Sequence, residues 1–537
     1  MNTYCQIDSV VFRNGRCFGW GWFLHPERVP ASMDLRLRGA DGTTYVIACL
    51  PGGRREDVRD AFPEVSHAVH AGFLITGSVP GLTAPPAHAE MEVAFRGGGV
   101  QSVTIPVACF AGTGGDPQGS GTPLWRRALD KVRRDGWRAA IAPTITIVRE
   151  WGAWWAGMPL RARLRFSHPR MHVIFDHAMG GGANRFADEL HANLVARGMP
   201  VMYVAPVLHE LRYAINLAWK GWKANWRVDD LRQLLDTLDS FEALDIHLNE
   251  LVSYDDPLGI VRWCTARRAK AAGDSLLLYL HDFHAVCPSW TLIGTDDRFC
   301  GIPAMDVCAN CLPRNSRHTL GYNGPGIPEW RQAWASLLGA CDRVVAFSRA
   351  SVGILHKAYP ALRPEIIELR QHAIDLNGVR PINGRSAVPL VVGVAGHVNI
   401  AKGALMLKEM AVLARERGMP VRFLVFGTLE QHEPGDPIEV FGEYRRGELP
   451  DLFEKHGVAM AMLPSVCAET YSYVTAEYMA MDMPVAVFPM GAPAERVADY
   501  PKGLVISRLD PAVALDEIIA FASRGFGEPS DAEEHRT

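Results

Sequence analysis

The stretch from residue 458 to residue 489 constrains the fold of this chain most strongly. It begins with an apolar run, Val458–Leu463, which Pro464 ends, and it continues in a helical pattern. A second short apolar run starts after Pro484. Short, continuously apolar runs are typical of strands buried on both faces of a parallel sheet. The stretch therefore predicts a strand, a helix and a strand in succession, as in an α/β domain.

Two carboxylates, Glu469 and Glu477, lie within this stretch at a spacing of a little over two helical turns. The spacing allows Glu469 to lie in the loop before the helix and Glu477 deeper along it. The residues between them, Thr470, Tyr471 and Ser472 first, would place backbone N–H groups at the helix N-terminus. An anionic phosphate is stabilised at such a position. The alternative is an ordinary amphipathic helix with two glutamates that face solvent.

The composition sets the broad class. A chain of 537 residues predicts two to four domains. Its 48% hydrophobic and 21% charged residues are typical of a soluble globular protein, and a net charge of −4 gives no case for nucleic acid as a partner. No run approaches the roughly 20 apolar residues that span a bilayer. The first residues do not resemble a signal peptide, and eleven cysteines are too few for a disulfide scaffold. We therefore expect a cytoplasmic protein.

Residues 1–110 predict a small all-β sandwich. Asn14-Gly15 and Asp41-Gly42 each separate two apolar runs, as hairpin turns do. Short strands at this spacing are typical of a sandwich. Trp20 and Trp22 are either core residues or a surface on which a sugar ring stacks.

Residues 111–168 are predicted to be a linker. It starts with a Gly-rich flexible segment, and a basic amphipathic helix follows at Pro123–Trp137. Trp151, Trp154 and Trp155 come next, followed by several arginines. Basic residues interleaved with Trp can lie on an anionic membrane surface, which would be the inner face of the membrane. An interdomain helix with a solvated basic face is the alternative.

Residues 169–385 predict a first α/β domain, residues 386–525 a second, and residues 526–537 a disordered tail. In the first domain a strand at 171–176 precedes a glycine loop with Gly181 and Gly182, a helix at about 185–197 and another strand. A later strand ends in His281-Asp282, and open α/β sheets bind ligands at that end of a strand. A structural role is the alternative for His281.

Four cysteines fall within one loop of the first domain. They are Cys287, Cys300, Cys308 and Cys311, and the last two form a Cys-x2-Cys pair. Four thiolates suit a tetrahedral structural Zn²⁺ and would leave no coordination position open for a substrate. Thiols without a metal, one pair of which is oxidised, are the alternative.

Together these motifs resemble those of the retaining glycosyltransferases of family 4. The resemblance covers residues 171–525 and rests on Glu469-x7-Glu477, Lys402-Gly403, His281-Asp282 and the glycine loop. It implies the GT-B fold, in which two Rossmann-like domains face each other across a cleft. The sandwich also resembles modules fused to bacterial polysaccharide glycosyltransferases.

The resemblance implies a role for each site residue. Glu469 would orient the donor sugar and His281 would bind one of its hydroxyls, so these two are the candidate catalytic residues. Glu477 would bind the ribose, and Lys402 with Gly403 would hold the diphosphate. Many members have Arg five residues before this Lys, whereas this chain has His397. Phosphate binding would then depend on His397 or on Arg445-Arg446.

The implied reaction moves a sugar from a nucleotide diphosphate sugar to a hydroxyl of a glycan or a lipid-linked glycan. Anomeric configuration is retained, no catalytic metal takes part, and the setting is the biosynthesis of a surface polysaccharide such as lipopolysaccharide. Two other functions stay open. A nucleotide-sugar epimerase can have the same fold, and a non-catalytic protein could use it as a carbohydrate-binding scaffold.

Overall fold

The computed structural model describes residues 3–110 and 170–526, except for a few short gaps. The gaps are residues 14, 54, 66, 80, 83–85, 96–97, 272, 316–317, 320–321, 323, 373, 375, 383–387, 434 and 446. Contacts divide the chain into two compact units, Met1–Tyr279 with Thr319–Val344 and Leu280–His318 with Val345–Thr537. The predicted linker helix and its tryptophans, the tail from residue 527 and Arg446 lie outside the described residues. No helix in the described parts is both long and apolar enough to cross a bilayer.

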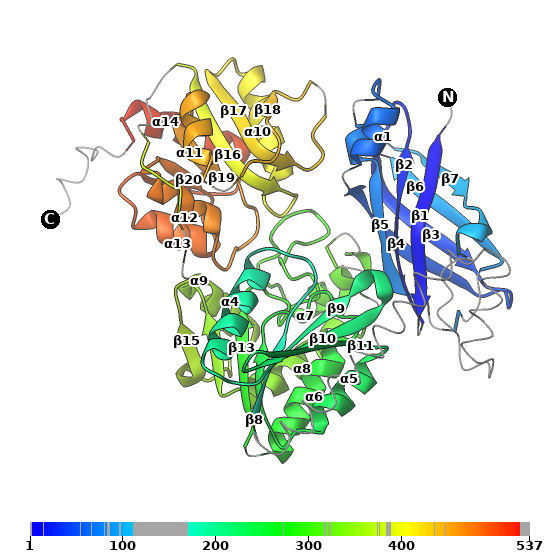
Figure 1. The fold of residues 1–537 in the computed structure, drawn as a ribbon. Coiled ribbons are helices and arrows are strands. Elements are labelled where there is room, and N and C mark those ends of the chain that lie inside the picture. The colour runs from blue at the N-terminus through cyan, green and yellow to red at the C-terminus, as the bar shows by residue number, and fades with distance from the viewer. Residues whose placement is uncertain are drawn as a thin grey trace. The chain divides into compact units, whose positions relative to one another are not determined.

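The N-terminal module is one antiparallel sheet of seven strands in the order β1-β2-β5-β4-β3-β6-β7 (Figure 1). The strands are β1 (Tyr4–Arg13), β2 (Arg16–Leu24), β3 (Pro30–Arg38), β4 (Thr44–Gly53), β5 (Gly72–Ser78), β6 (His88–Phe95) and β7 (Val100–Thr104). A short helix, α1 (Glu56–Ala61), lies between β4 and β5. The β-rich prediction is confirmed, whereas the described residues of the module form one sheet and not the two separate sheets of a sandwich.

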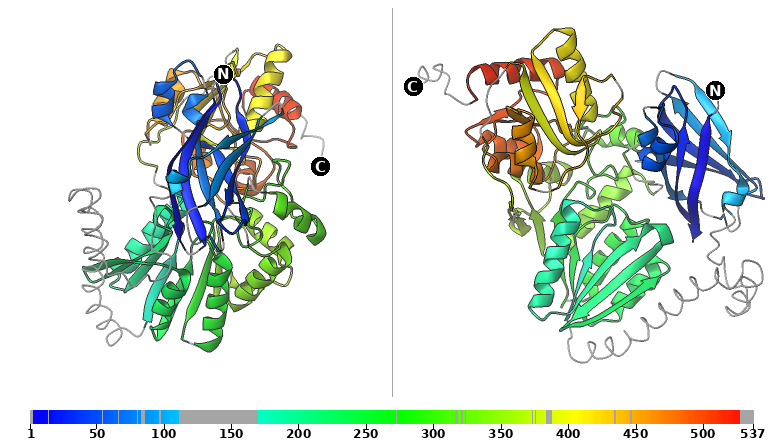
Figure 2. Two further views of the ribbon diagram at one scale, coloured as in Figure 1. Left: turned by 90° about the vertical axis from the view of Figure 1, so that its right-hand side faces the viewer. Right: turned by 45° about the horizontal axis from the view of Figure 1, so that its top comes forward.

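Irregular pairing lets this single sheet enclose its own core. The register shifts in β1, β3 and β4, and such bulges bend a strand. The sheet curls, and the side chains of Thr3 and Gln101, from its two ends, are hydrogen-bonded at 2.9 Å (Figure 2). In β2, Gly19 and Gly21 alternate with Trp20 and Trp22. Both glycine positions exclude a side chain, because a Cβ there would lie within 2.5 Å of a β1 carbonyl oxygen.

The second sheet has eight strands in the order β11-β10-β9-β8-β12-β13-β14-β15. The strands are β8 (Arg170–Phe175), β9 (Val201–Val207), β10 (Arg212–Trp219), β11 (Trp222–Val228), β12 (Ala243–Leu248), β13 (Ser275–Leu280), β14 (Arg343–Ala346) and β15 (Ile367–Leu369). The helices are α4 (Gly182–Ala196), α5 (Leu231–Asp239), α6 (Pro257–Lys270), α7 (Met305–Cys311), α8 (Ile327–Ala340) and α9 (Arg349–Ala358). Strands β9, β8, β12 and β13 are parallel, and the β10–β11 hairpin extends the sheet at one edge.

The third sheet has six strands in the order β18-β17-β16-β19-β20-β21, all of them parallel. The strands are β16 (Leu390–Val398), β17 (Val421–Leu429), β18 (Ile438–Val440), β19 (Met460–Leu463), β20 (Val485–Val487) and β21 (Gly503–Val505). The helices are α10 (Ala404–Glu416), α11 (Leu449–Lys455), α12 (Tyr473–Ala480), α13 (Gly491–Ala498) and α14 (Pro511–Ser523).

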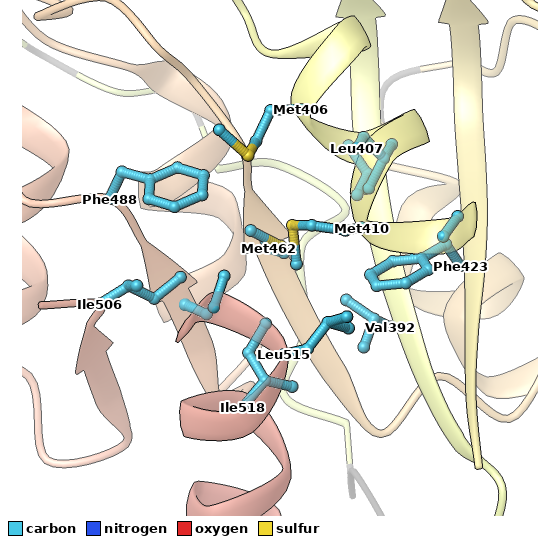
Figure 3. Packing of buried hydrophobic residues seen from close by; sticks show 14 of the residues in the cluster. Val392, Met406, Leu407, Met410, Phe423, Met462, Phe488, Ile506, Leu515 and Ile518 are labelled. Atoms are coloured by element: carbon cyan, nitrogen blue, oxygen red, sulfur yellow. The ribbon is translucent and has the colours of Figure 1, made fainter. Parts of the chain in front are cut away.

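Both faces of this third sheet are covered by helices. On one face, side chains of α10 and α14 pack with strand residues such as Val392 and Met462 (Figure 3). On the other face, Phe453 of α11 and Tyr478 of α12 pack with Phe426. All residues of β19 and β20 are buried, which is why the sequence shows them as unbroken apolar runs. The predicted α/β fold class is confirmed.

Candidate functional site

The strand order of the third sheet locates a ligand-binding edge. Numbered along the chain, it is 3-2-1-4-5-6, so the order reverses between β16 and β19. Open α/β sheets bind ligands at the carboxyl ends of the two strands on either side of such a reversal. Here those ends are followed by two loops, residues 399–403 after β16 and residues 464–472 after β19. We call these the β16 loop and the β19 loop.

The two loops touch each other through their backbones. The N–H of Val466 donates to the carbonyl oxygen of Ala401 at 3.0 Å. Gly403 has a φ of 85°, and a Cβ there would lie 1.9 Å from the carbonyl oxygen of Pro464. Only glycine fits such a position, because it tolerates both the left-handed backbone and the close approach. The sequence motif Lys402-Gly403 therefore lies directly against the β19 loop.

Glu469 lies in the β19 loop, four residues before α12, and its side chain is partly exposed. The hydroxyl of Ser465 donates to its Oε1. Its carbonyl oxygen accepts from the N–H of Ala492 at 2.8 Å, and Gly491 leaves no room for a Cβ beside it. The start of α13 thus holds the Glu469 backbone, which leaves its carboxylate directed by Ser465.

The thiol of Cys467 is within electrostatic reach of both Lys402 and Glu469. Burial raises the pKa of Cys467, Glu469 raises it further, and Lys402 lowers it. Both charged groups therefore act on the same buried sulfur. The raised pKa keeps this thiol protonated near neutral pH, and a protonated thiol is a weak nucleophile.

His397 does not replace the missing cation near Lys402. Desolvation of its ring is the largest of the effects that lower its pKa, and Lys402 lowers it further. The imidazole is therefore neutral at pH 7 and binds as a hydrogen-bonding group. Its Nδ1 is hydrogen-bonded to the Thr428 hydroxyl, which leaves Nε2 as the other ring nitrogen.

Helix α12 begins at Tyr473, and Ser472 caps it. The Ser472 hydroxyl accepts from the N–H of Thr475 at 3.3 Å. Ser472 has a φ of 92°, which is rare for a residue with a Cβ and marks a constrained turn. Glu477 lies in α12, close enough to add to the effect of burial in raising the pKa of Tyr444. The two glutamates thus occupy a loop and a helix, as the spacing predicts.

Thr470 and Tyr471 contact other residues of the same unit. The Thr470 hydroxyl donates to the carbonyl oxygen of His281 at 2.6 Å. The Tyr471 ring is 4.4 Å from the ring of His372, which in turn stacks on Phe347 at 3.9 Å. His281 stacks on the same Phe347 at 4.7 Å. The structure therefore brings His281 to the β19 loop through an aromatic cluster.

His372 is the centre of this cluster, and sequence reasoning did not single it out. It is 9% exposed, and its Nδ1 lies 3.2 Å from the Tyr473 hydroxyl. Burial, with a smaller effect of Arg496, lowers the pKa of His372 to about 4. The ring is neutral at pH 7 and can hold Tyr473, the first residue of α12, through one hydrogen bond.

Arg496 of α13 is a second residue that the sequence did not reveal. Its Nη1 donates to the carbonyl oxygen of Ser472 at 3.1 Å, and its guanidinium lies 4.9 Å from the Tyr471 ring centroid. An arginine inside an amphipathic helix gives no local signal of such a role. Its position brings a permanent cation to the turn before α12.

Gly181 and Gly182 lie in the other unit, at the corresponding edge of the second sheet. Gly181 has a φ of 100° and precedes α4, which begins at Gly182. Asp176, just after β8, is fully buried and accepts from Asn249 Nδ2 at 2.7 Å. Since Asn249 follows β12, this bond joins the ends of two adjacent parallel strands and supports the glycine loop between β8 and α4.

The four cysteines of the predicted zinc site do not form one. No group of three or more His, Cys, Asp or Glu in the described parts of the chain could hold a metal ion. Cys308 and Cys311 lie on helix α7, where Cys308 contacts the Pro303 carbonyl oxygen at 3.7 Å and Cys311 contacts Asn315 at 3.7 Å. The prediction of zinc bound by Cys287, Cys300, Cys308 and Cys311 is therefore not supported. The spacing of Cys308 and Cys311 in the sequence did not reveal that both lie on one helix.

One comparison with known proteins covers the third sheet. Residues 389–524 match the family model described as glycosyl transferases group 1. This range begins just before β16 and ends just after α14. The match supports a glycosyltransferase domain within residues 389–524. No curated protein is significantly similar to the chain in sequence.

Several solved structures are similar to the chain at low identity. Sucrose-phosphate synthase from Thermosynechococcus elongatus has 14% identity and a TM-score of 0.41, over 66% of this chain and 90% of that chain. HepE from Anabaena, in complex with UDP and glucose, has 14% identity and a TM-score of 0.39, over 66% and 95%. A glycosyltransferase from Rickettsia africae has 13% identity and a TM-score of 0.42, over 67% and 90%. At these scores the similarities assign no role to any residue of this chain.

Proposed function

We propose that the protein is a retaining glycosyltransferase that moves a sugar from a nucleotide diphosphate sugar to a hydroxyl of a glycan or a lipid-linked glycan. The observation that carries the proposal is the contact between the β16 and β19 loops at the strand-order reversal. It supports a single site that contains Lys402, Glu469 and the N-terminus of α12, within residues that match glycosyl transferases group 1. The setting we propose is cytoplasmic assembly of a surface polysaccharide.

Such a site must above all stabilise the negative charge of the departing diphosphate. Lys402 supplies one cation, and the backbone N–H groups at the start of α12 supply partial positive charge. Arg496, bonded to Ser472, adds the second cation that a neutral His397 does not provide. Preorganised groups of this kind stabilise charge that develops in the transition state without reorganising during the reaction.

The remaining residues position the sugar and the nucleoside. Glu469, oriented by Ser465, would bond the donor sugar, Glu477 would bind the ribose and His281 would bond a sugar hydroxyl. With its Nδ1 engaged by Thr428, His397 would offer Nε2 to a phosphate oxygen. Gly181 and Gly182 would allow the acceptor or the donor phosphate to approach the backbone. The leaving phosphate would take the acceptor proton.

A thermal-shift series on the full-length protein tests this function. Nucleoside diphosphates and their sugars are screened against wild type, Lys402→Ala and Lys455→Ala. Lys455, an exposed lysine in the last turn of α11, is the matched control. A bound ligand raises the melting temperature by mass action. We expect one nucleotide to stabilise wild type and Lys455→Ala but not Lys402→Ala.

Product analysis separates the other two functions. A transferase consumes the stabilising nucleotide sugar only when an acceptor is present, apart from slow hydrolysis. An epimerase converts it without an acceptor. Failure of all nucleotides to stabilise the folded protein would contradict the proposal and favour a carbohydrate-binding scaffold.

A further inference from the structure

The tip of the β10–β11 hairpin exposes an aromatic ring between two cations. Strand β11 is the edge of the second sheet (Figure 1). Trp222 is 60% exposed, more than any other Trp, Tyr or Phe among the described residues. Lys220 and Lys223 flank it and are also exposed. An exposed Trp of this kind leaves a large apolar surface in water.

Trp222 continues an apolar row that is otherwise covered. Along β10 the alternate residues Tyr213, Ile215, Leu217 and Trp219 are each at most 4% exposed. Trp222 pairs with Trp219 across the turn, so both side chains project from the same face of the hairpin. The row is therefore buried as far as Trp219, and its next member, Trp222, is exposed.

The turn itself holds a lysine in a backbone conformation that lysine rarely adopts. Lys220 and Gly221 have φ values of 44° and 82°, the two positive values of a two-residue hairpin turn. Asn-Gly suits these positions, whereas a lysine in the left-handed region is strained. The chain nevertheless has a lysine there, with its Nζ 5.0 Å from the Trp219 ring centroid.

Both lysines remain available to an anionic partner. Within the described residues neither Lys220 nor Lys223 forms an ion pair. Lys223 acts electrostatically on His191 of α4: burial lowers the pKa of this histidine, Asp188 raises it and Lys223 lowers it further. The tip is thus positive, although the whole chain has a net charge of −4.

We propose that this tip docks on an anionic lipid bilayer, with Trp222 among the headgroups and Lys220 and Lys223 near the phosphates. Trp is enriched at membrane interfaces because its ring is amphipathic. A protruding ring between cations needs no pocket, which suits a lipid surface better than a protein partner. Two lysines alone are too few to bind nucleic acid tightly.

The position of the tip on the sheet fits such docking. β10 pairs with β9 so that Ala218 lies opposite Val201, the first residue of β9. The tip therefore lies at the amino-terminal edge of the parallel strands, and Gly181 and Asp176 lie at the carboxyl edge. Docking through the hairpin would therefore leave the carboxyl edge of this sheet away from the bilayer. The inference does not depend on the proposed function.

Vesicle co-sedimentation of the full-length protein tests the proposal. Vesicles of phosphatidylcholine alone are compared with vesicles that also contain phosphatidylglycerol, at low and at high salt. The variants are Trp222→Ala, Lys220→Asn and Lys223→Gln. Trp20→Ala is the matched control, because Trp20 is also exposed but lies in the N-terminal module. Lys220→Asn removes the charge and suits the turn, so it does not lower the melting temperature.

We expect wild type to prefer anionic vesicles and to be released by salt. Each lysine variant should lower the partition coefficient on anionic vesicles about fivefold, as expected for one cation near such a surface. Trp222→Ala should weaken binding to both kinds of vesicle, and Trp20→Ala should bind like wild type. Binding that all three hairpin variants leave unchanged would overturn the proposal and point to the Trp-rich residues 123–165. Absence of wild-type binding would overturn it as well.

Discussion

Gly403→Ala is the substitution that tests the site geometry most directly. An alanine at a φ of 85° costs about 1–2 kcal/mol in a left-handed conformation. Its Cβ would also lie 1.9 Å from the Pro464 carbonyl oxygen, so one of the two loops must move. Forced repacking of this kind costs about 1–3 kcal/mol more. The free energy of unfolding of this domain should fall by about 2–5 kcal/mol.

Gly418→Ala provides the matched control. Gly418 follows α10 with a φ of 60°, and nothing lies within 4 Å of the position of its Cβ. In this variant the free energy of unfolding falls only by the conformational cost of about 1–2 kcal/mol. At roughly 2–4 °C per kcal/mol, Gly403→Ala should melt about 2–12 °C below Gly418→Ala in a thermal-shift assay. Gly403→Ala should also lose stabilisation by the nucleotide, whereas Gly418→Ala should keep it. Equal melting temperatures and equal nucleotide shifts would refute the close approach of the two loops.

Three further outcomes are expected. Since the pKa of His372 is about 4 in the folded protein and about 6.5 when unfolded, acidification through this window favours the unfolded state, by at most about 3 kcal/mol. His372→Asn should therefore flatten the loss of stability between about pH 6.5 and pH 4, and His88→Asn, at an exposed position, is the control. If His372→Asn leaves the dependence of stability on pH unchanged, the buried ring is contradicted. Glu469→Gln should lower kcat by about 10²–10³ with donor affinity nearly kept, as for loss of one preorganised polar group; an unchanged kcat would exclude a role in transfer. A chelator should leave the melting temperature unchanged, whereas a drop would restore the zinc hypothesis for the four cysteines.

Much of the third sheet could be predicted because its signals are local. β19 is buried on both faces, so its sequence is an unbroken apolar run. Lys402-Gly403 and the Glu469–Glu477 spacing are likewise properties of short segments. Turn chemistry and periodicity act between near neighbours, and a sequence displays them directly.

The errors arose where the outcome depended on distant contacts. Hairpin signals in residues 1–110 predicted strands correctly, but they could not distinguish two sheets from one curled sheet. That choice depends on bulges and on contacts between the ends of the module, such as Thr3 with Gln101. The Cys308 and Cys311 spacing suits a metal knuckle or one turn of a helix, and only the structure shows the helix.

The sequence by itself determined the α/β class and singled out Lys402, Gly403 and Glu469 at the ends of strands as candidate site residues. Only the tertiary structure decided which side chains surround them. His372, Phe347 and Arg496 are far from the β19 loop in sequence, yet they contact Tyr471, His281 and Ser472. No local pattern records such neighbours, because the parallel strands and their crossover helices bring them together only when the sheet has formed.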